Sequence, residues 1–240
     1  MKILDLNQFN EKIKIVPLSD DDFHNIPDDL YKYHPETKKE LKSIIEERIK
    51  KEGNECNLND IDTSNITDMS ELFSNMNKFN GDISGWDVSN VENMDNMFYN
   101  AKSFKGDISG WNVSNVESMK YMFSFAQSFN SDISGWYVSN VTDMARMFQC
   151  AKKFNSDISR WDVKNVKYMD GMFFEAKSFN HDISGWDVSS AVDMFCMFKG
   201  AELFNQDLSG WNVQNNVIRR TYMFEDCPLD DQPDKQPNFK

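Results

Sequence analysis

Several residue types are scarce in this 240-residue chain, and each scarcity argues against a class of protein. The four cysteines show no Cys-x-x-Cys spacing, so the sequence predicts free thiols rather than a zinc site or a disulfide framework. The three histidines have no recognisable nucleophile or carboxylate partner, and there is no P-loop, Gly-x-Ser-x-Gly or His-Glu-x-x-His motif. We therefore expect no enzymatic activity and no cofactor.

Long apolar runs are missing as well. No stretch approaches the roughly 20 residues of a membrane helix, so membrane insertion is not expected. The start of the sequence as given, Met1 to Leu6, is interrupted by Asp5 and lacks both the apolar region of a signal peptide and a lipobox cysteine. These absences predict a cytoplasmic location for the chain as given.

Positive charge is in the minority, and the formal net charge of the chain is −13. Between residues 57 and 227 we count 14 Lys and Arg against 23 Asp and Glu. This excess of negative charge would repel nucleic acid and anionic membranes, so neither is expected as a partner.

Proline is absent from a long central stretch. All six prolines lie outside it, at Pro17, Pro27, Pro35, Pro228, Pro233 and Pro237. Because proline breaks helices and removes a backbone donor, its absence marks the folded part. We divide the chain into an N-terminal extension (1–34), a capping helix (35–56), a repeat array (57–227) and a polar tail (228–240) that is predicted to be disordered.

A helix is predicted within residues 35–56. Thr37 and Glu40 have the spacing of a capping box, and Gly53 stands where a helix commonly ends. Between them, apolar residues recur on one helical face, at Leu41, Ile44, Ile45 and Ile49. We expect this helix to cover the exposed apolar end of the first repeat, with partner binding as the alternative role.

The most regular feature of the chain is a 25-residue repeat. All six tryptophans follow this period, at Trp86, Trp111, Trp136, Trp161, Trp186 and Trp211. A degenerate copy begins near Asn57, and one residue is inserted between Asn215 and Arg220. A fixed period of this length predicts about seven stacked coils, beginning at residues 57, 82, 107, 132, 157, 182 and 207.

Two apolar periods alternate within each coil. Trp86 and Val88 alternate with polar residues, which is typical of a short strand. From Met94 onward the spacing changes to that of a helical face, with Met97, Phe98 and Ala101. The sequence therefore predicts an α/β repeat solenoid with a short parallel strand and a short helix in each coil. Asparagines are expected to bond backbone groups at the turns, at Asn90, Asn115, Asn140, Asn165 and Asn215.

The repeat resembles two known patterns. Ile83-x-x-Trp86-x-Val88-x-Asn90 is similar to the L-x-x-L-x-L-x-x-N segment of leucine-rich repeats, with the asparagine one place early. The whole unit, D-I-S-G-W-D-V-S-N-V-x-x-M-x-x-M-F-x-x-A-x-x-F-N, resembles the repeats of BspA-like bacterial surface proteins, including repeats first noted in mycoplasma lipoproteins. The resemblance covers about residues 35–227. It implies a surface or secreted interaction protein without catalytic activity in the repeat.

Two repeated residue series have both a structural and a functional interpretation. The tryptophans and the phenylalanine series could stack on sugars, but their identity in every coil favours a core role. One aspartate recurs in each coil from the second onward, at Asp82, Asp107, Asp132, Asp157, Asp182 and Asp207. These carboxylates could bind calcium or could accept hydrogen bonds from backbone N–H groups at a turn, and we favour the turn.

Candidate partner-binding residues are sought among the variable positions. The residue after each tryptophan is expected to point outward from the strand, and five of these residues form what we call the outward stripe: Asp87, Asn112, Tyr137, Asp162 and Asp187. The sequence favours a non-catalytic scaffold that binds a protein partner through this stripe. The alternatives are a glycan-binding or calcium-stabilised surface adhesion module and a merely solvated acidic face.

Overall fold

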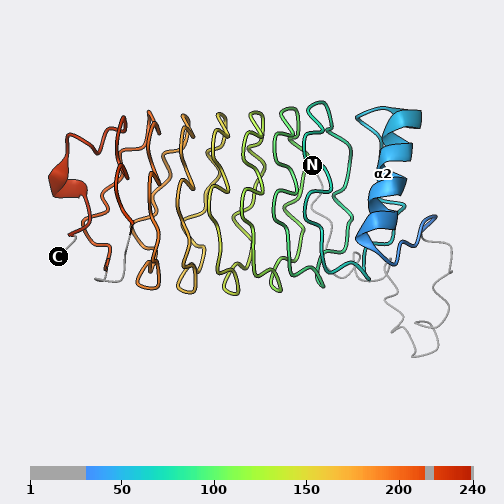
Figure 1. Ribbon diagram of the computed structural model, residues 1–240, viewed down its shortest axis with the longest axis horizontal. Helices are drawn as coiled ribbons and strands as arrows, with labels where there is room; N and C mark the ends of the chain where they lie inside the picture. The colour runs from blue at the N-terminus through green and yellow to red at the C-terminus, as the bar shows by residue number, and fades with distance from the viewer. Residues whose placement is uncertain (1–30, 214–218, 239–240) are drawn as a thin grey trace, which may run out of the picture.

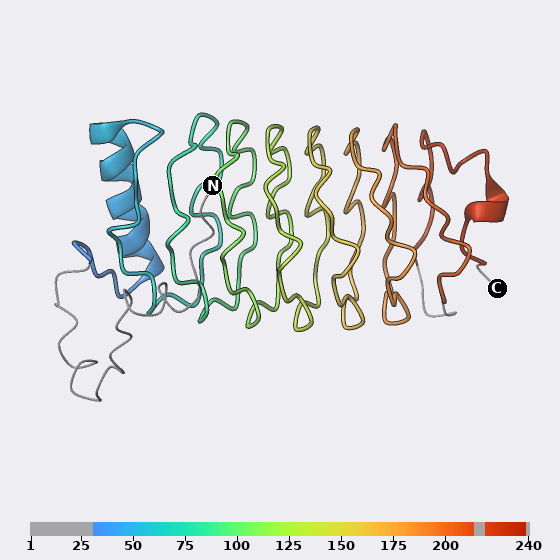
Figure 2. The ribbon, with the colours of Figure 1, turned by 180° about the vertical axis from the view of Figure 1, so that it is seen from behind.

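Backbone hydrogen bonds with a 25-residue period join neighbouring coils along the chain (Figure 1). The computed structural model describes residues 31–213 and 219–238. In this part of the chain the coils lie side by side along the long axis of the molecule, with one α-helix at the N-terminal end of the stack (Figures 1 and 2). Parallel bridges connect equivalent residues of successive coils, at Asp68, Asn93, Ser118, Asp143, Tyr168, Asp193 and Arg219.

The predicted α/β, leucine-rich-repeat-like solenoid is wrong. Within the described residues the bridges are isolated and form no strand, and no coil contains an α-helix. The regular elements of this part of the chain are the helix α2 (Lys38–Glu52) and the short 3-10 helix η2 (Pro233–Lys235). Each coil instead consists mainly of β-turns, in which a backbone N–H bonds the carbonyl three residues earlier, as in Trp86 to Ile83 and Val91 to Val88.

The segment predicted to be helical is a run of consecutive turns, which we call the ladder segment (residues 94–100 and their equivalents). In the second coil the N–H groups of Met97 and Tyr99 donate to carbonyls three residues back. The N–H groups that alternate with these donate to the next coil, as Phe98 does to the Met122 carbonyl at 2.9 Å. Consecutive turns bring residues spaced by three and four to one side, so they reproduce the apolar spacing of a helix.

Positive backbone φ angles explain why the ladder segment does not become helical. They recur at two places in each coil, for example at Asn96 (φ 57°) and Asn100 (φ 58°). Each of these two residues is third in a four-residue turn, where a type II turn requires a positive φ. Asparagine and glycine tolerate this conformation best, and Gly171 and Gly200 occupy it in later coils.

The core consists of stacked aromatic columns, which confirms the structural interpretation of the tryptophans. All six tryptophans are 3–4% exposed, and in four of the five neighbouring pairs the rings stack 6.4–6.5 Å apart. The indole N–H of Trp136 donates to the Ile108 carbonyl of the preceding coil at 3.1 Å, and the other five tryptophans make the equivalent bond. Two phenylalanine columns, one through Phe98 and one through Phe104, fill the space beside them.

Helix α2 begins and ends where the sequence predicts. The Thr37 hydroxyl accepts a hydrogen bond from the Glu40 N–H, and the Gly53 N–H bonds the Ile49 carbonyl. The Glu40 carboxylate, however, bonds the N–H of Glu36 rather than that of Thr37. Leu41 and Ile45 are fully buried, so the apolar face of α2 packs against the core at the N-terminal end of the stack.

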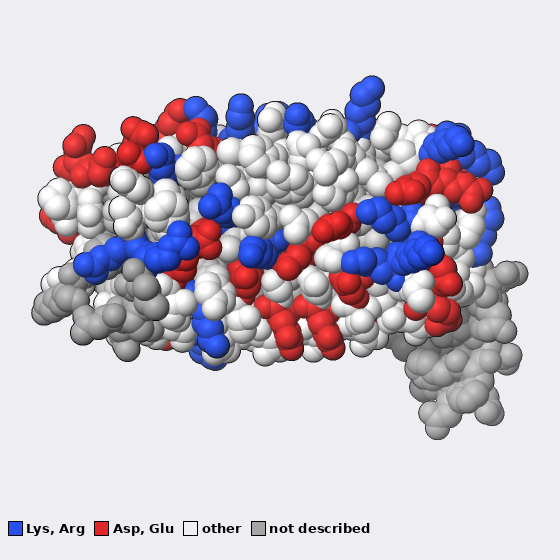
Figure 3. Space-filling view, in the orientation of Figure 1, with Lys and Arg blue, Asp and Glu red and all other residues white. Residues whose placement is uncertain are grey.

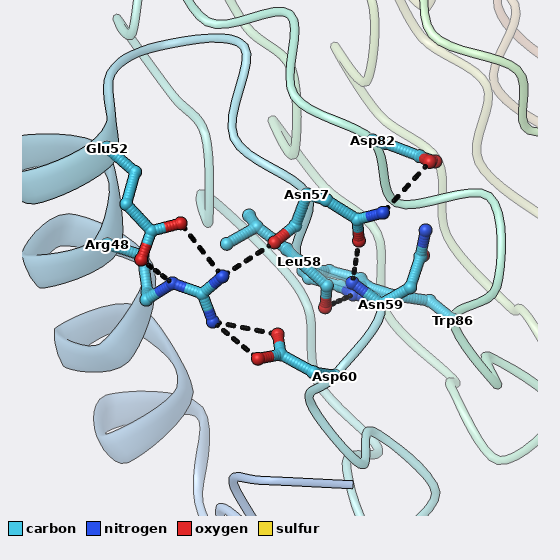
Figure 4. Close-up of polar contacts among 8 residues, drawn as sticks. All are labelled: Arg48, Glu52, Asn57, Leu58, Asn59, Asp60, Asp82 and Trp86. Atoms are coloured by element: carbon cyan, nitrogen blue, oxygen red, sulfur yellow. Dashed lines mark hydrogen bonds and ion pairs between the residues drawn. The ribbon is translucent and has the colours of Figure 1, made fainter. Parts of the chain in front are cut away.

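A buried arginine joins α2 to the first coil (Figure 4). The Arg48 guanidinium pairs with both Glu52 and Asp60 at 2.7 Å, and it also donates to the Asn57 carbonyl at 2.8 Å. The hydrogen bonds that Arg48 donates to Glu52 raise its pKa most. Burial opposes this effect, and the hydrogen bonds to Asp60 raise the pKa further. All the donors of this buried charge thus meet carboxylates or a carbonyl, which fixes the helix on the stack.

The C-terminal segment covers the last coil. We expected residues 228–240 to be disordered, but Leu229 and Pro237 are buried, and the Leu208 N–H bonds the Lys235 carbonyl at 2.8 Å. The register changes from 25 to 26 residues between Asp193 and Arg219, as the one-residue insertion predicts. Cys227 occupies the alanine position and is buried there, which raises its pKa to about 11. None of the described helices is long and apolar enough to cross a membrane.

Candidate functional site

The repeated polar residues of the coils first have to be separated into structural and free groups. The aspartate that opens each coil from the second onward accepts the backbone N–H of the residue two places later through Oδ1. Asp132, for example, accepts from the Ser134 N–H at 2.9 Å. This is an Asx-turn, in which a carboxylate or amide oxygen takes the place of a backbone carbonyl. The bond from this backbone N–H, followed by that from the Ser134 hydroxyl, lowers the pKa of Asp132.

The same geometry occurs throughout the series considered for calcium. An Oδ1 atom accepts a serine N–H at 2.9–3.0 Å at Asp82, Asp107, Asp132, Asp157, Asp182 and Asp207. No cluster of three metal-ligating side chains occurs among the described residues. These contacts support the turn-capping role, in which the serine N–H groups offset the repulsion between neighbouring carboxylates. Asn90, Asn115, Asn140 and Asn165 bond backbone carbonyls of the preceding coil as expected, while Asn215 lies outside the described residues.

The outward stripe is exposed although it is not part of a strand. All five of its residues alternate with buried neighbours, because the backbone between the two turns of each coil still alternates its side chains. Four of the five also form Asx-turns: the residue two places later donates to Asp87 at 2.9 Å, Asn112 at 3.2 Å, Asp162 at 3.3 Å and Asp187 at 3.1 Å. The aspartates and asparagine of the stripe therefore have a structural function that the sequence interpretation missed.

Tyr137 is the exception in the outward stripe. Its side chain cannot accept the Asx-turn hydrogen bond, and it is 75% exposed. A ring that is so largely exposed contributes little hydrophobic stabilisation, and the turn after it lacks the side-chain acceptor that Asp or Asn provides in the other coils of the stripe. Nothing in the packing of the fold therefore accounts for a tyrosine at this position.

Two further departures from the repeat occur in the coil next to Tyr137. Arg160 stands where five coils have glycine, and Lys164 stands where the neighbouring coils have serine. Tyr137, Arg160 and Asp162 line one shallow depression of about 470 Å³ whose remaining lining is residues 134–136, Val138 and Ser139. The sequence interpretation did not select Arg160 or Lys164. Comparing the exposed positions of all coils would have found them.

The charged side chains in and beside this depression differ in whether they form an ion pair. The Lys164 ammonium pairs with the Asp162 carboxylate at 2.9 Å, so these two charges compensate one another. Arg160 is exposed and forms no ion pair with any residue that the structure describes. Arg160 lies within electrostatic range of Asp157, whose pKa is lowered mainly by the hydrogen bonds from Ser159 and to a smaller extent by the Arg160 charge. Beside Tyr137 there is thus an arginine without a close ion pair, in a chain whose net charge is −13. On the face of the molecule seen in Figure 3, acidic and basic side chains are interspersed.

A second groove, larger than the depression beside Tyr137, lies apart from the outward stripe. It has a volume of about 690 Å³ and runs across the first four coils. Its lining contains Glu92 and Glu117 together with serine, threonine and asparagine residues, and no residue of the outward stripe. The groove is polar and lacks an exposed aromatic side chain.

The comparison with protein families supplies an identity at the level of the repeat. Residues 39–149 and 131–235 match the family described as "Mycoplasma protein of unknown function, DUF285". Among curated proteins, none matches the chain. Because the two matched regions together extend from residue 39 to residue 235, the chain belongs to this repeat-containing Mycoplasma family.

Proposed function

We propose that the protein is a non-catalytic binding scaffold and that it contacts a partner protein through the outward stripe, with Tyr137 at the centre. The observation that carries this proposal is the exposure of Tyr137 at a position where the other members of the stripe form an Asx-turn. Tyrosine is enriched among the residues that dominate the binding energy of protein interfaces. A tyrosine without a role in packing is therefore best explained as an anchor.

The backbone around Tyr137 suits such an anchor because it is held on both sides. Trp136 and Val138 are buried, and the Trp136 indole is bonded to the preceding coil. A rigid support reduces the entropy lost when a partner binds. Asp87 and Asp187, two coils to either side of Tyr137, favour basic or hydrogen-bonding groups in the outer parts of the partner surface.

We further propose that the repeats belong to the BspA-like type and act at the cell surface or after secretion. The near-identical D-I-S-G-W units support this narrower assignment within the family. A glycan is the alternative ligand, because an exposed tyrosine ring beside polar groups also fits a sugar. The buried tryptophan and phenylalanine columns offer no exposed ring for that purpose.

A comparison of three baits tests the proposal. Proteins from the source organism are captured on the wild-type chain, on Tyr137→Ala and on Tyr222→Ala, whose tyrosine is also exposed but lies at the C-terminal end of the stack. We expect a partner whose affinity falls by about 2 kcal/mol or more with Tyr137→Ala and is unchanged with Tyr222→Ala. A partner that binds Tyr137→Ala as tightly as wild type would place the binding site elsewhere. A ligand released by glycosidase treatment would favour the glycan.

The charged members of the stripe give a second measurement on the same partner. Reversing Asp162 and Asp187 to lysine should mainly slow association with a partner whose outer parts are basic. The effect should shrink as salt rises, because screening shortens the range of the interaction to about 8 Å or less above physiological ionic strength. Association rates that do not change with charge or salt would show that the acidic residues serve the turns alone.

A further inference from the structure

The side chains that line the depression beside Tyr137 indicate which chemical group of a partner would bind there. We propose that the depression recognises a carboxylate side chain of the partner protein, held by Arg160 next to an apolar side chain that packs on Tyr137. This inference rests on the proposed function, since it names the group that the same surface selects. Three observations carry it: an exposed arginine without a close ion pair, the tolerance of its position, and the pairing of Asp162 with Lys164.

The position of Arg160 does not require an arginine for folding. Five other coils have glycine there, and a Cβ atom added to Gly110, Gly135, Gly185 or Gly210 would meet no atom within 4 Å. None of these glycines has a positive φ. The position is therefore open to solvent and can hold any side chain, so packing does not require the guanidinium there.

The Arg160 guanidinium is available to a ligand. Arg160 lines the depression together with Tyr137, and its guanidinium makes no ion pair within the described part of the chain. The one carboxylate that also lines the depression, that of Asp162, is bonded by Lys164 through both its backbone N–H and its ammonium group. Lys164 thus compensates the charge of Asp162. Asp157, outside the depression, interacts electrostatically with Arg160 but forms no close ion pair with it, so a bound carboxylate would have to displace only this weaker interaction.

A planar guanidinium matches a carboxylate with two parallel hydrogen bonds, which gives geometric as well as electrostatic selection. The Tyr137 ring beside it offers an aromatic surface for an aliphatic or aromatic neighbour of that carboxylate. The preferred partner segment therefore has a central Asp or Glu next to an apolar residue. Its ends are neutral or basic, because Asp87 and Asp187 flank the depression at a distance of one or two coils.

A random dodecapeptide library displayed on phage provides the test. It is selected on the full chain in four forms: wild type, Arg160→Gly, Arg160→Glu and Tyr137→Ala. Arg160→Gly restores the residue of five other coils, so its folding is expected to be intact and is checked by circular dichroism and thermal unfolding. We expect wild-type protein to enrich peptides in which Asp or Glu adjoins an apolar residue, and Arg160→Glu to enrich Lys or Arg in its place.

Peptides from the wild-type selection are then synthesised with Glu or with Gln at the acidic position. Replacing Glu by Gln, or Arg160 by Gly, should each weaken binding about tenfold, and both changes together should weaken it little more, as coupled partners do. Peptides that lose affinity with Tyr137→Ala but bind Arg160→Gly as well as wild type would overturn this inference and leave the proposed function standing. Failure to enrich any peptide that depends on Tyr137 would overturn both.

Discussion

Replacing Tyr137 by aspartate should make the protein more stable and at the same time remove the anchor of the proposed binding site. In the other coils of the outward stripe an aspartate or asparagine at this position accepts the N–H two residues later. The geometry at Asp87, 2.9 Å from the Ser89 N–H, shows what the substitution would introduce. An exposed hydrogen bond of this kind has a net value of about 0.5–1.5 kcal/mol. Little apolar burial is lost in exchange, because the tyrosine side chain is 75% exposed.

The expected net gain is thus about 0.5–1 kcal/mol. For a chain of this size it corresponds to a rise in the melting temperature of roughly 1–4 °C. Thermal unfolding followed by circular dichroism can measure this, with Asp87→Tyr as the mirror variant, which should lower the melting temperature by a similar amount. If Tyr137→Asp instead lowered it, the tyrosine would contribute to the fold, and the argument that it is present for binding would fail.

Further substitutions examine the core, the helix junction and a half-buried carboxylate. Trp136→Ala should lower the free energy of unfolding by about 3–5 kcal/mol, and Trp211→Ala by less, since Trp211 stacks on one tryptophan instead of two. Urea titrations that gave the same loss of free energy for both variants would contradict this account of the stacked core. Arg48→Ala leaves the Glu52 and Asp60 carboxylates without their partner and should lower the free energy of unfolding by about 2–3 kcal/mol. This is less than for a fully buried pair because both carboxylates are partly exposed. Lys50→Ala, at an exposed position of the same helix, is the near-neutral control. Burial raises the pKa of Asp143, so its charge opposes folding at neutral pH and this opposition is relieved as the pH falls through the raised pKa. Asp143→Asn should therefore raise the melting temperature at pH 7 and have less effect in acid, and a lower melting temperature at pH 7 would refute this.

The sequence predicted the repeat more reliably than the backbone that carries it. The tryptophan period predicted the number and register of the coils, because identical residues solve the same packing problem in each coil. The alternation around Trp86 correctly separated buried from exposed side chains but could not distinguish a strand from two successive turns. The spacing from Met94 to Ala101 fits a helix and a run of turns equally well, and the asparagines at positive φ were the available signal for turns.

The site and the tail show the same limit of pattern reasoning. Residues of the outward stripe were correctly expected to be exposed, yet their Asx-turns could not be inferred without the positions of the N–H groups two residues later. Disorder was predicted for residues 228–240 from their polar composition. The few apolar residues of this segment, among them Leu229, are enough to cover the last coil because its face is already formed.

The direction of the hydrogen bonds in the ladder segment has a consequence for self-association. Each coil uses these N–H groups to reach carbonyls of the following coil, from Met69 to Gly200. The stack therefore ends in carbonyls on one side and in N–H groups on the other, where those of Tyr222 and Phe224 meet no carbonyl among the described residues. Helix α2 lies at the carbonyl end, and its Lys42 bonds the Glu71 carbonyl at 3.1 Å. Two copies that met at their C-terminal ends would bring donor against donor, and head-to-tail growth of the stack would meet helix α2 at one end and the C-terminal segment at the other.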